Sequence, residues 1–169
     1  DPDFKYAGVN PCAEEPLPAG GSCLLGSLNL AAFVDEDEWG PKFAFEDFED
    51  AVELAVVALN DVLDEGLPLH PLEEQRKSVA DWRQIGLGIF GLADMLIQLG
   101  CKYGSRDANI LCHKIARTMA TAALRSSAKL AAEFGAYPKF NKGAVMSSEF
   151  FNEHFDDETW KLTDAFGLR

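Results

Sequence analysis

The chain has 169 residues, 47% of them hydrophobic, and its 28 acidic and 15 basic residues give a net charge of −13. This length and composition predict one domain with a real hydrophobic core and argue against disorder. The acidic surface excludes a nucleic-acid-binding module, because it repels phosphate backbones. The sequence contains no apolar run of about 18 residues, so it predicts no membrane span.

Residues 1–34 are rich in proline and glycine, which interrupt short apolar runs. Phe4 to Val9 and Cys23 to Val34 are typical of extended segments, and the stretch between them predicts a loop. The acidic residues Asp35 to Glu38 then lead to a predicted turn at Gly40-Pro41.

From about Glu46 the hydrophobic period becomes helical. A first helix is predicted to end at Gly66 and Pro68, and its apolar face holds Phe48, Val52, Ala55, Val56, Leu59 and Leu63. Leu54, Val57 and Val62 widen this face, so we expect the helix to be buried on several sides.

Pro71 is suited to open a second helix, and helical spacing predicts that Ser78 to Leu99 is helical as well. This segment contains Gly86-Leu87-Gly88-Ile89-Phe90-Gly91, which matches the G-x-G-x-x-G fingerprint of dinucleotide-binding proteins. That fingerprint requires a preceding strand, whereas Ser78 to Gln84 is polar. We therefore interpret the glycines as sites in a helix where a neighbouring backbone comes close, and not as a nucleotide site.

A long helix is predicted over Arg106–Phe134, with Ser105 as its N-cap and Gly135 as its stop. The tail, which begins with a loop rich in Pro, Asn and Gly, predicts short helices after Ser147 and Asp157. The expected fold class is thus mainly α with a few short strands, and residues 46–169 are mostly helical.

Four cysteines are present, and the three histidines are scattered: Cys12, Cys23, Cys101 and Cys112, with His70, His113 and His154. No C-x-x-C spacing occurs, so a structural zinc site is not expected. No signal peptide opens the chain, which indicates a reducing, cytoplasmic location where disulfides are rare. Cys101 and Cys112 fall in helical patterns and are expected to be core thiols.

The segment Asn10-Pro11-Cys12-Ala13-Glu14 alternates an amide, a thiol and a carboxylate with two-residue spacing. Pro11 favours an extended conformation at Asn10, and in an extended segment the three side chains face the same side. Glu14 and Glu15 disfavour a thiolate at Cys12, so the pattern predicts chemistry of a neutral thiol. The structural alternative is that Cys12 is a small buried hydrophobic residue.

Two stretches together resemble the large, catalytic chains of ribonucleotide reductases. The first is Asn10-Pro11-Cys12-Ala13-Glu14, followed by the Cys-x-Leu-x-x-x-Asn-Leu pattern over Cys23–Leu30; the second is Arg83–Asp94. They occur in the family's order, and the resemblance extends through the chain, weakening after residue 137. The resemblance implies a fragment of a ten-stranded α/β barrel, in which residues 1–34 would be a finger loop with flanking strands.

By this resemblance, Cys12 is the residue that is oxidised to a thiyl radical and abstracts the 3′ hydrogen of a ribonucleotide. Glu14 takes the proton of the 3′ hydroxyl, Asn10 hydrogen-bonds the substrate, and Cys23 is one member of the reducing dithiol. The implied partners are a ribonucleoside di- or triphosphate, a thioredoxin-like reductant, the remainder of the barrel and a second copy in a homodimer.

Pro11 makes the loop more similar to the adenosylcobalamin-dependent class than to the classes with a separate metal-containing radical subunit. No cobalamin signature, initiator Met or second motif cysteine is present, and the chain stops after a helical pattern at Gly167-Leu168-Arg169. We therefore expect a segment that is inactive alone, exposes apolar surface and associates through it.

Two other classes of protein remain open from the residues. The first alternative is a helical scaffold module with buried structural cysteines. The second is a thiol-disulfide oxidoreductase that uses Cys12 and Cys23, although the spacing of these cysteines lacks the compact C-x-x-C form. The placement of Cys12 discriminates the scaffold module from a catalytic chain: a core thiol is packed among apolar side chains, whereas a catalytic thiol faces a groove with Asn10 and Glu14.

Overall fold

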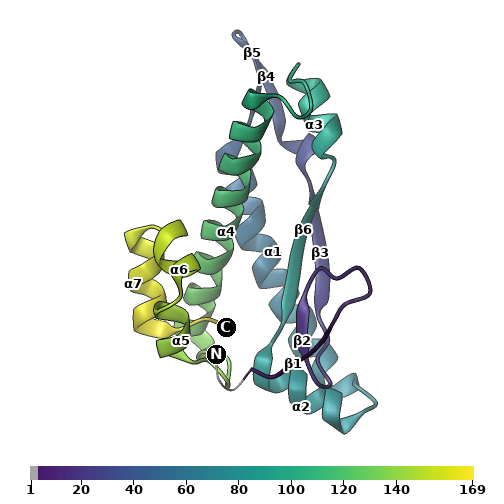
Figure 1. The fold of residues 1–169 in the computed structure, drawn as a ribbon, viewed down its shortest axis with the longest axis vertical. Coiled ribbons are helices and arrows are strands. Elements are labelled where there is room, and N and C mark those ends of the chain that lie inside the picture. The colour runs from purple at the N-terminus through teal and green to yellow at the C-terminus, as the bar shows by residue number, and fades with distance from the viewer. Residues whose placement is uncertain (1–3) are drawn as a thin grey trace.

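Two long helices, α1 (Phe45–Gly66) and α4 (Arg106–Phe134), pack along each other beside a pair of parallel strands, β3 (Leu24–Asn29) and β6 (Ile85–Phe90) (Figure 1). This arrangement comes from a computed structural model, which describes residues 4–169. Helices dominate and strands are few and short, so the predicted fold class is confirmed.

The remaining elements are short. The strands are β1 (Tyr6–Val9), β2 (Pro16–Pro18), β4 (Val34–Asp37) and β5 (Gly40–Phe43). The α-helices are α2 (Glu73–Trp82), α3 (Leu92–Gln98), α5 (Lys142–Met146), α6 (Glu149–His154) and α7 (Asp157–Phe166), and the 3-10 turns are η1 (Leu30–Phe33) and η2 (Leu67–Leu69).

The core lies between α1, α4 and the strand pair. Its largest fully buried side chains include Phe48 and Val52 of α1, Leu30 of η1 and Met95 of α3. The opposite face of α1 is open, because Leu54 is 69% exposed. The expectation that α1 is buried on several sides is therefore wrong for the described residues, although the face predicted from its spacing is the buried one.

The predicted helix over Ser78–Leu99 is wrong. Helix α2 ends at Trp82, Arg83 takes a left-handed conformation with φ 47°, and the chain then forms β6 before α3 begins. Apolar residues alternate with glycine along β6, a two-residue period that fits a strand, and glycine disfavours a helix interior. The glycines therefore lie in a strand and its following turn, not in a packed helix.

Strands β3 and β6 pair in parallel, from Leu24 opposite Ile85 to Asn29 opposite Phe90. Alternate side chains point to opposite faces of the pair. Leu28 and Leu87 are on the face that packs against the helical core. Leu25, on the other face, is 61% exposed. The pair thus has one face covered by helices and one open face.

Two antiparallel hairpins flank the parallel pair. Strands β1 and β2 form the first; β1 lies in the predicted extended segment Phe4 to Val9, whereas β2 lies in the stretch that the sequence predicted as a loop. In the second, β4–β5, Asp37 pairs with Gly40, so the reversal lies at Glu38–Trp39. The predicted turn at Gly40-Pro41 is thus displaced by two residues, because these residues begin β5.

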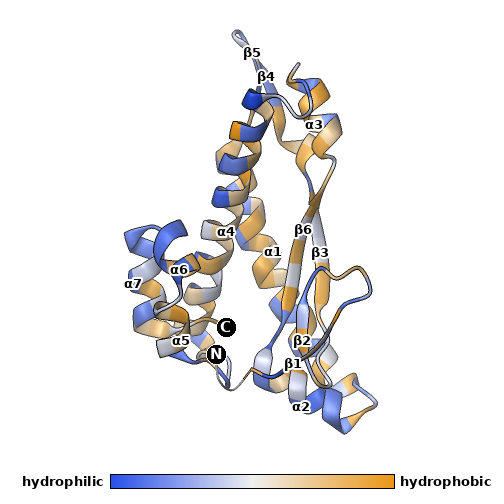
Figure 2. Ribbon diagram, in the orientation of Figure 1, coloured by the Kyte–Doolittle hydropathy of each residue, from blue (hydrophilic) through white to orange (hydrophobic). Residues whose placement is uncertain are grey.

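The predicted limits of the longest helix are confirmed. The Ser105 hydroxyl accepts a hydrogen bond from the Ala108 N–H at 3.1 Å, and α4 ends at Gly135 with φ 86°. Helices α6 and α7 follow where the sequence predicted short helices, and α7 packs on α4. Figure 2 shows hydrophobic residues concentrated along β3, β6 and α1, whereas α6 and α7 are more hydrophilic. No helix among residues 4–169 is long and apolar enough to cross a membrane.

Candidate functional site

Residues 10–15 form the tip of the β1–β2 hairpin, and this tip is a turn. The Asn10 N–H donates to the Glu15 carbonyl at 3.1 Å, and the Ala13 N–H donates to the Asn10 carbonyl at 2.8 Å. Ala13 has a positive φ of 61°, which reverses the chain. The predicted extended segment is therefore wrong, because local hydrogen bonds close a turn around Pro11.

Cys12 lies exposed in this turn. Its backbone N–H donates to the Glu14 carboxylate at 3.1 Å, so the thiol and the carboxylate predicted to act together belong to one compact loop. Asn10 is half-buried at the start of the same turn. The exposure of Cys12 contradicts the alternative in which it is a packed core thiol.

Cys23 immediately precedes β3 and is half-buried. Its Sγ donates a hydrogen bond to Glu15 Oε2 at 2.5 Å. Burial, and then the hydrogen bond and charge of Glu15, raise the pKa of the Cys23 thiol far above its ordinary value. The thiol form of Cys23 is therefore favoured over the thiolate.

The sequence pattern does not indicate Glu15 as a site residue. The two-residue spacing indicates Glu14, because Glu14 alternates with Cys12, whereas it is Glu15 that accepts a hydrogen bond from Cys23. The signal available was only that two glutamates stand side by side, and which of them meets Cys23 depends on the hairpin.

The base of the hairpin is attached to β6 through Gln84. Gln84 Nε2 donates to the Pro16 carbonyl at 3.2 Å and lies 3.5 Å from Glu15 Oε1. Two residues on, Gly86 leaves the space that the cysteine needs: a Cβ at this position would lie 2.8 Å from Cys23 Sγ and 3.2 Å from Glu15 Oε2. Hairpin, β3 and β6 thus meet around one thiol.

Arg83 anchors this corner to α1. Its side chain is 6% exposed, and its guanidinium donates two hydrogen bonds to Asp64, at 2.6 and 3.0 Å, and a third to Asn60 at 3.2 Å. The hydrogen bond from Arg83 lowers the pKa of Asp64. The left-handed conformation of Arg83 directs the chain from α2 into β6.

The other two cysteines lie away from the hairpin. Cys112 lies in α4, as predicted, but it is half-buried and does not join the core cluster. Cys101 follows the turn after α3 and packs at the edge of the core, so its helical placement was wrong. All four cysteines are free thiols. Within residues 4–169, no group of three or more His, Cys, Asp or Glu side chains is arranged to hold a metal ion.

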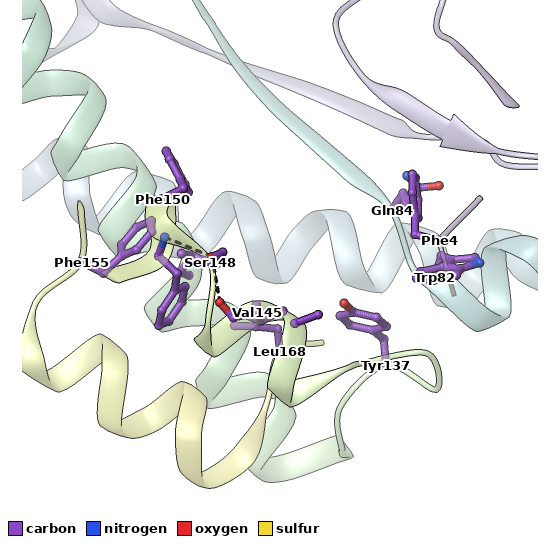
Figure 3. A pocket seen from close by; sticks show the side chains of 12 residues that line it. Phe4, Trp82, Gln84, Tyr137, Val145, Ser148, Phe150, Phe155 and Leu168 are labelled. Atoms are coloured by element: carbon purple, nitrogen blue, oxygen red, sulfur yellow. Dashed lines mark hydrogen bonds between the residues drawn. The ribbon is translucent and has the colours of Figure 1, made fainter. Parts of the chain in front are cut away.

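Gln84 also lines a cavity of about 450 Å³ (Figure 3). Its walls are mostly aromatic and aliphatic, and include Phe4, Trp82, Tyr137, Phe150 and Phe155. Gln84, Tyr137 and Ser148 bring its polar side chains, and no charged side chain from residues 4–169 lines it. The cavity therefore lacks the cations that a nucleotide's phosphates require, and we do not assign the substrate to it.

A parallel strand pair backed by helices on one face, with a thiol-bearing hairpin at its end, defines a piece of an α/β protein. The model of the family described as "Ribonucleotide reductase, barrel domain" matches residues 6–165. The chain therefore belongs to the ribonucleotide reductase family and is a part of its barrel domain.

Several relatives agree with this assignment. A vitamin B12-dependent ribonucleoside-diphosphate reductase of Mycobacterium tuberculosis is 37% identical over 136 residues, which are 80% of this chain and 19% of that protein. A reductase of the same name from Thermoplasma acidophilum is 37% identical over 130 residues, 77% of the chain and 16% of that protein. The ribonucleoside-diphosphate reductase large subunit of African swine fever virus is 35% identical over 135 residues, 80% of the chain and 17% of that protein.

Proposed function

We propose that this chain is the part of a ribonucleotide reductase catalytic subunit that carries its radical cysteine, and that the full-length enzyme converts ribonucleotides to deoxyribonucleotides. The observation that carries the proposal is the exposed Cys12 in a hairpin turn whose base reaches a second thiol, Cys23. This placement favours a sulfur that meets a substrate over one that fills a core.

Within this proposal Cys12 becomes the thiyl radical and removes the 3′ hydrogen of the ribonucleotide. Glu14 accepts the proton of the 3′ hydroxyl, and the amide of Asn10 hydrogen-bonds the substrate at the same centre. The turn supports these roles, because the hydrogen bond from the Cys12 N–H fixes the Glu14 carboxylate beside the sulfur's backbone. A thiyl radical is destroyed in open water, so the parent barrel must close around this turn.

Cys23 is proposed as one of the two reducing thiols, with its partner cysteine on another part of the full-length protein. The half-buried position on the open face of the strand pair agrees with this role. The chain spans 19% of the Mycobacterium tuberculosis relative, so a segment of this size is proposed to be inactive alone.

Adenosylcobalamin is proposed as the radical source, by analogy with the vitamin B12-dependent relatives and with the proline at position 11. When bound, it would supply the radical chemistry that oxidises the thiol of Cys12. The exposed sulfur of Cys12 fits a cofactor that is held by other parts of the enzyme. No residue of this chain is assigned to its binding, and a separate metal-containing radical subunit is the alternative source.

The proposed partners follow from the same assignment. They are a ribonucleoside di- or triphosphate, a thioredoxin-like reductant and a second copy of the enzyme in a homodimer, in a reducing cytoplasm. The net charge of −13 supports placing the residues that bind the phosphates elsewhere in the full-length protein.

The test is deoxynucleotide formation by the full-length enzyme, with and without adenosylcobalamin. Turnover should require the cofactor and fall to background in Cys12→Ala, because alanine has no hydrogen atom that the cofactor can remove to give a thiyl radical. Cys112→Ala is the matched control, since this half-buried thiol lies in α4 and should be dispensable. Turnover that persists in Cys12→Ala would exclude the radical role of Cys12.

A further inference from the structure

Glu15 makes a direct hydrogen bond to the Cys23 thiol. Cys23 Sγ donates to Glu15 Oε2 at 2.5 Å, and the carbonyl of Leu24 lies within 3.6 Å of the same sulfur. The two residues are eight positions apart and belong to different strand ends, so the contact depends on the closed hairpin.

The surroundings of this contact hold both partners in place. Gln84 Nε2 lies 3.5 Å from the second oxygen of Glu15 and donates to the Pro16 carbonyl at 3.2 Å. The absent side chain of Gly86 provides the space for the sulfur and the carboxylate, which a Cβ would approach to 2.8 and 3.2 Å. Three chain segments thus contribute to one thiol–carboxylate pair.

The charge of Glu15 acts on the protonation of Cys23. A carboxylate that accepts the S–H hydrogen bond stabilises the thiol and repels the thiolate. Burial and Glu15 both raise the pKa of Cys23, and Glu14 adds a smaller effect through space alone. Of the two neighbouring glutamates, Glu15 is therefore the one that hydrogen-bonds this sulfur and has the larger effect on its pKa.

We propose that Glu15 is a positioning residue for Cys23, which fixes the direction of the sulfur and takes up its proton when the sulfur is oxidised. This inference rests on the proposed role of Cys23 as one of two reducing thiols. The pair of thiols loses two electrons and two protons as the S–S bond forms. The ribonucleotide takes up these two electrons and two protons as its 2′ carbon–oxygen bond breaks. One carbon–hydrogen bond and one water molecule form. The Cys23 proton passes through Glu15 Oε2 on this route.

The experiment measures alkylation of Cys23 by iodoacetamide in the full-length enzyme, from pH 6 to pH 10, with the modified cysteine identified by peptide mass. The thiolate attacks the methylene carbon, the carbon–iodine bond breaks, iodide leaves and the thiol proton goes to solvent. Glu15→Gln should move the pH profile of Cys23 to lower pH and accelerate its alkylation at neutral pH by about tenfold, which corresponds to one pKa unit.

Two matched variants separate hydrogen bonding from general effects. Glu14→Gln removes a neighbouring charge that makes no hydrogen bond to Cys23, so its shift should be much smaller. Glu15→Asp keeps the charge and should restore part of the wild-type profile. An unchanged Cys23 profile in Glu15→Gln would overturn the inference, as would equal shifts in Glu14→Gln and Glu15→Gln.

Turnover measurements distinguish this inference from the proposed function. In Glu15→Gln, kcat should fall and its pH profile should change, while KM for the nucleotide stays the same, since Glu15 acts through the sulfur. Full turnover in Cys23→Ser would overturn the redox role of Cys23 itself. The alkylation profile needs no turnover, so it tests the Glu15–Cys23 pair independently.

Discussion

The two glycines within β6, Gly86 and Gly88, differ in how much space surrounds them. A Cβ at Gly86 would lie 2.7 Å from Leu25 Cδ2 and 2.8 Å from Cys23 Sγ. At Gly88 the nearest atom is Ser27 Oγ, at the ordinary distance of 3.4 Å. Both positions are on the open face of the strand pair, so the difference comes from the side chains beside them. A side chain at position 86 would collide with Cys23 and Leu25, whereas a Cβ at position 88 would make only an ordinary contact with Ser27.

Gly86→Ala should therefore destabilise the chain by about 1–3 kcal/mol, the usual cost of overpacking a filled site. Gly88→Ala is the matched control and should be neutral or stabilising by up to about 1 kcal/mol, because alanine reduces the entropy of the unfolded chain. Urea unfolding followed by circular dichroism measures both. Equal midpoints for the two variants would show that Cys23 and Leu25 move aside at little cost.

At the scale of elements, the Arg83–Asp64 ion pair fastens the α2–β6 junction to α1. The side chain of Arg83 is buried, whereas that of Asp64 is 47% exposed, so water weakens the attraction and its contribution to stability is modest. Asp64 Oδ2, which accepts one of the hydrogen bonds from Arg83, also lies 3.4 Å from the guanidinium nitrogen Nη2 of Arg169. One carboxylate therefore links α1 to two distant parts of the chain.

This ion pair predicts a pH dependence of stability. Arg83 lowers the pKa of Asp64 in the folded state, so its contribution is present above the unfolded pKa of about 3.9 and disappears as pH falls through the folded value. Asp64→Asn should be less stable than wild type at pH 7, and this difference should shrink below about pH 4. Urea midpoints between pH 7 and pH 3 give the comparison. A difference that stays constant with pH would mean that the charge of Asp64 contributes nothing.

The elements also show how far the sequence alone could lead. Helix α4 was predicted with both ends, because Ser105 and Gly135 are local signals that act within one turn. Strand β6 was missed, since its apolar residues fit both a two-residue and a helical period, and only pairing with β3 decides between them. The motif indicates Cys12 and Cys23 as candidates from the sequence alone, whereas Glu15 meets Cys23 through a contact that only the folded hairpin makes.

At the scale of the whole molecule, the strand pair has an uncovered face. Leu25 is 61% exposed and Phe90 is 55% exposed, and both lie on the face opposite the helices. Both edges of the two-stranded sheet are unpaired in the described part of the chain. Unpaired edges and exposed apolar side chains together favour association.

We therefore expect the chain to associate in solution, which light scattering measures. Replacing both Leu25 and Phe90 by Gln should lower the mean mass toward that of a monomer. Trp39→Gln is the control, because Trp39 is 88% exposed but lies in the β4–β5 turn, away from the strand pair. A monodisperse monomer of the unaltered chain would contradict the prediction.

The parallel pairing of β3 and β6 also has a kinetic consequence. Leu24 and Ile85 are separated in the sequence by the β4–β5 hairpin, α1 and α2. Their pairing therefore closes a long loop. Contacts of this kind form slowly, whereas helices form within microseconds. During refolding the helices should therefore appear first, and Cys23 should stay open to thiol reagents until the strands meet. The chemistry of this thiol thus depends on one of the latest events of folding.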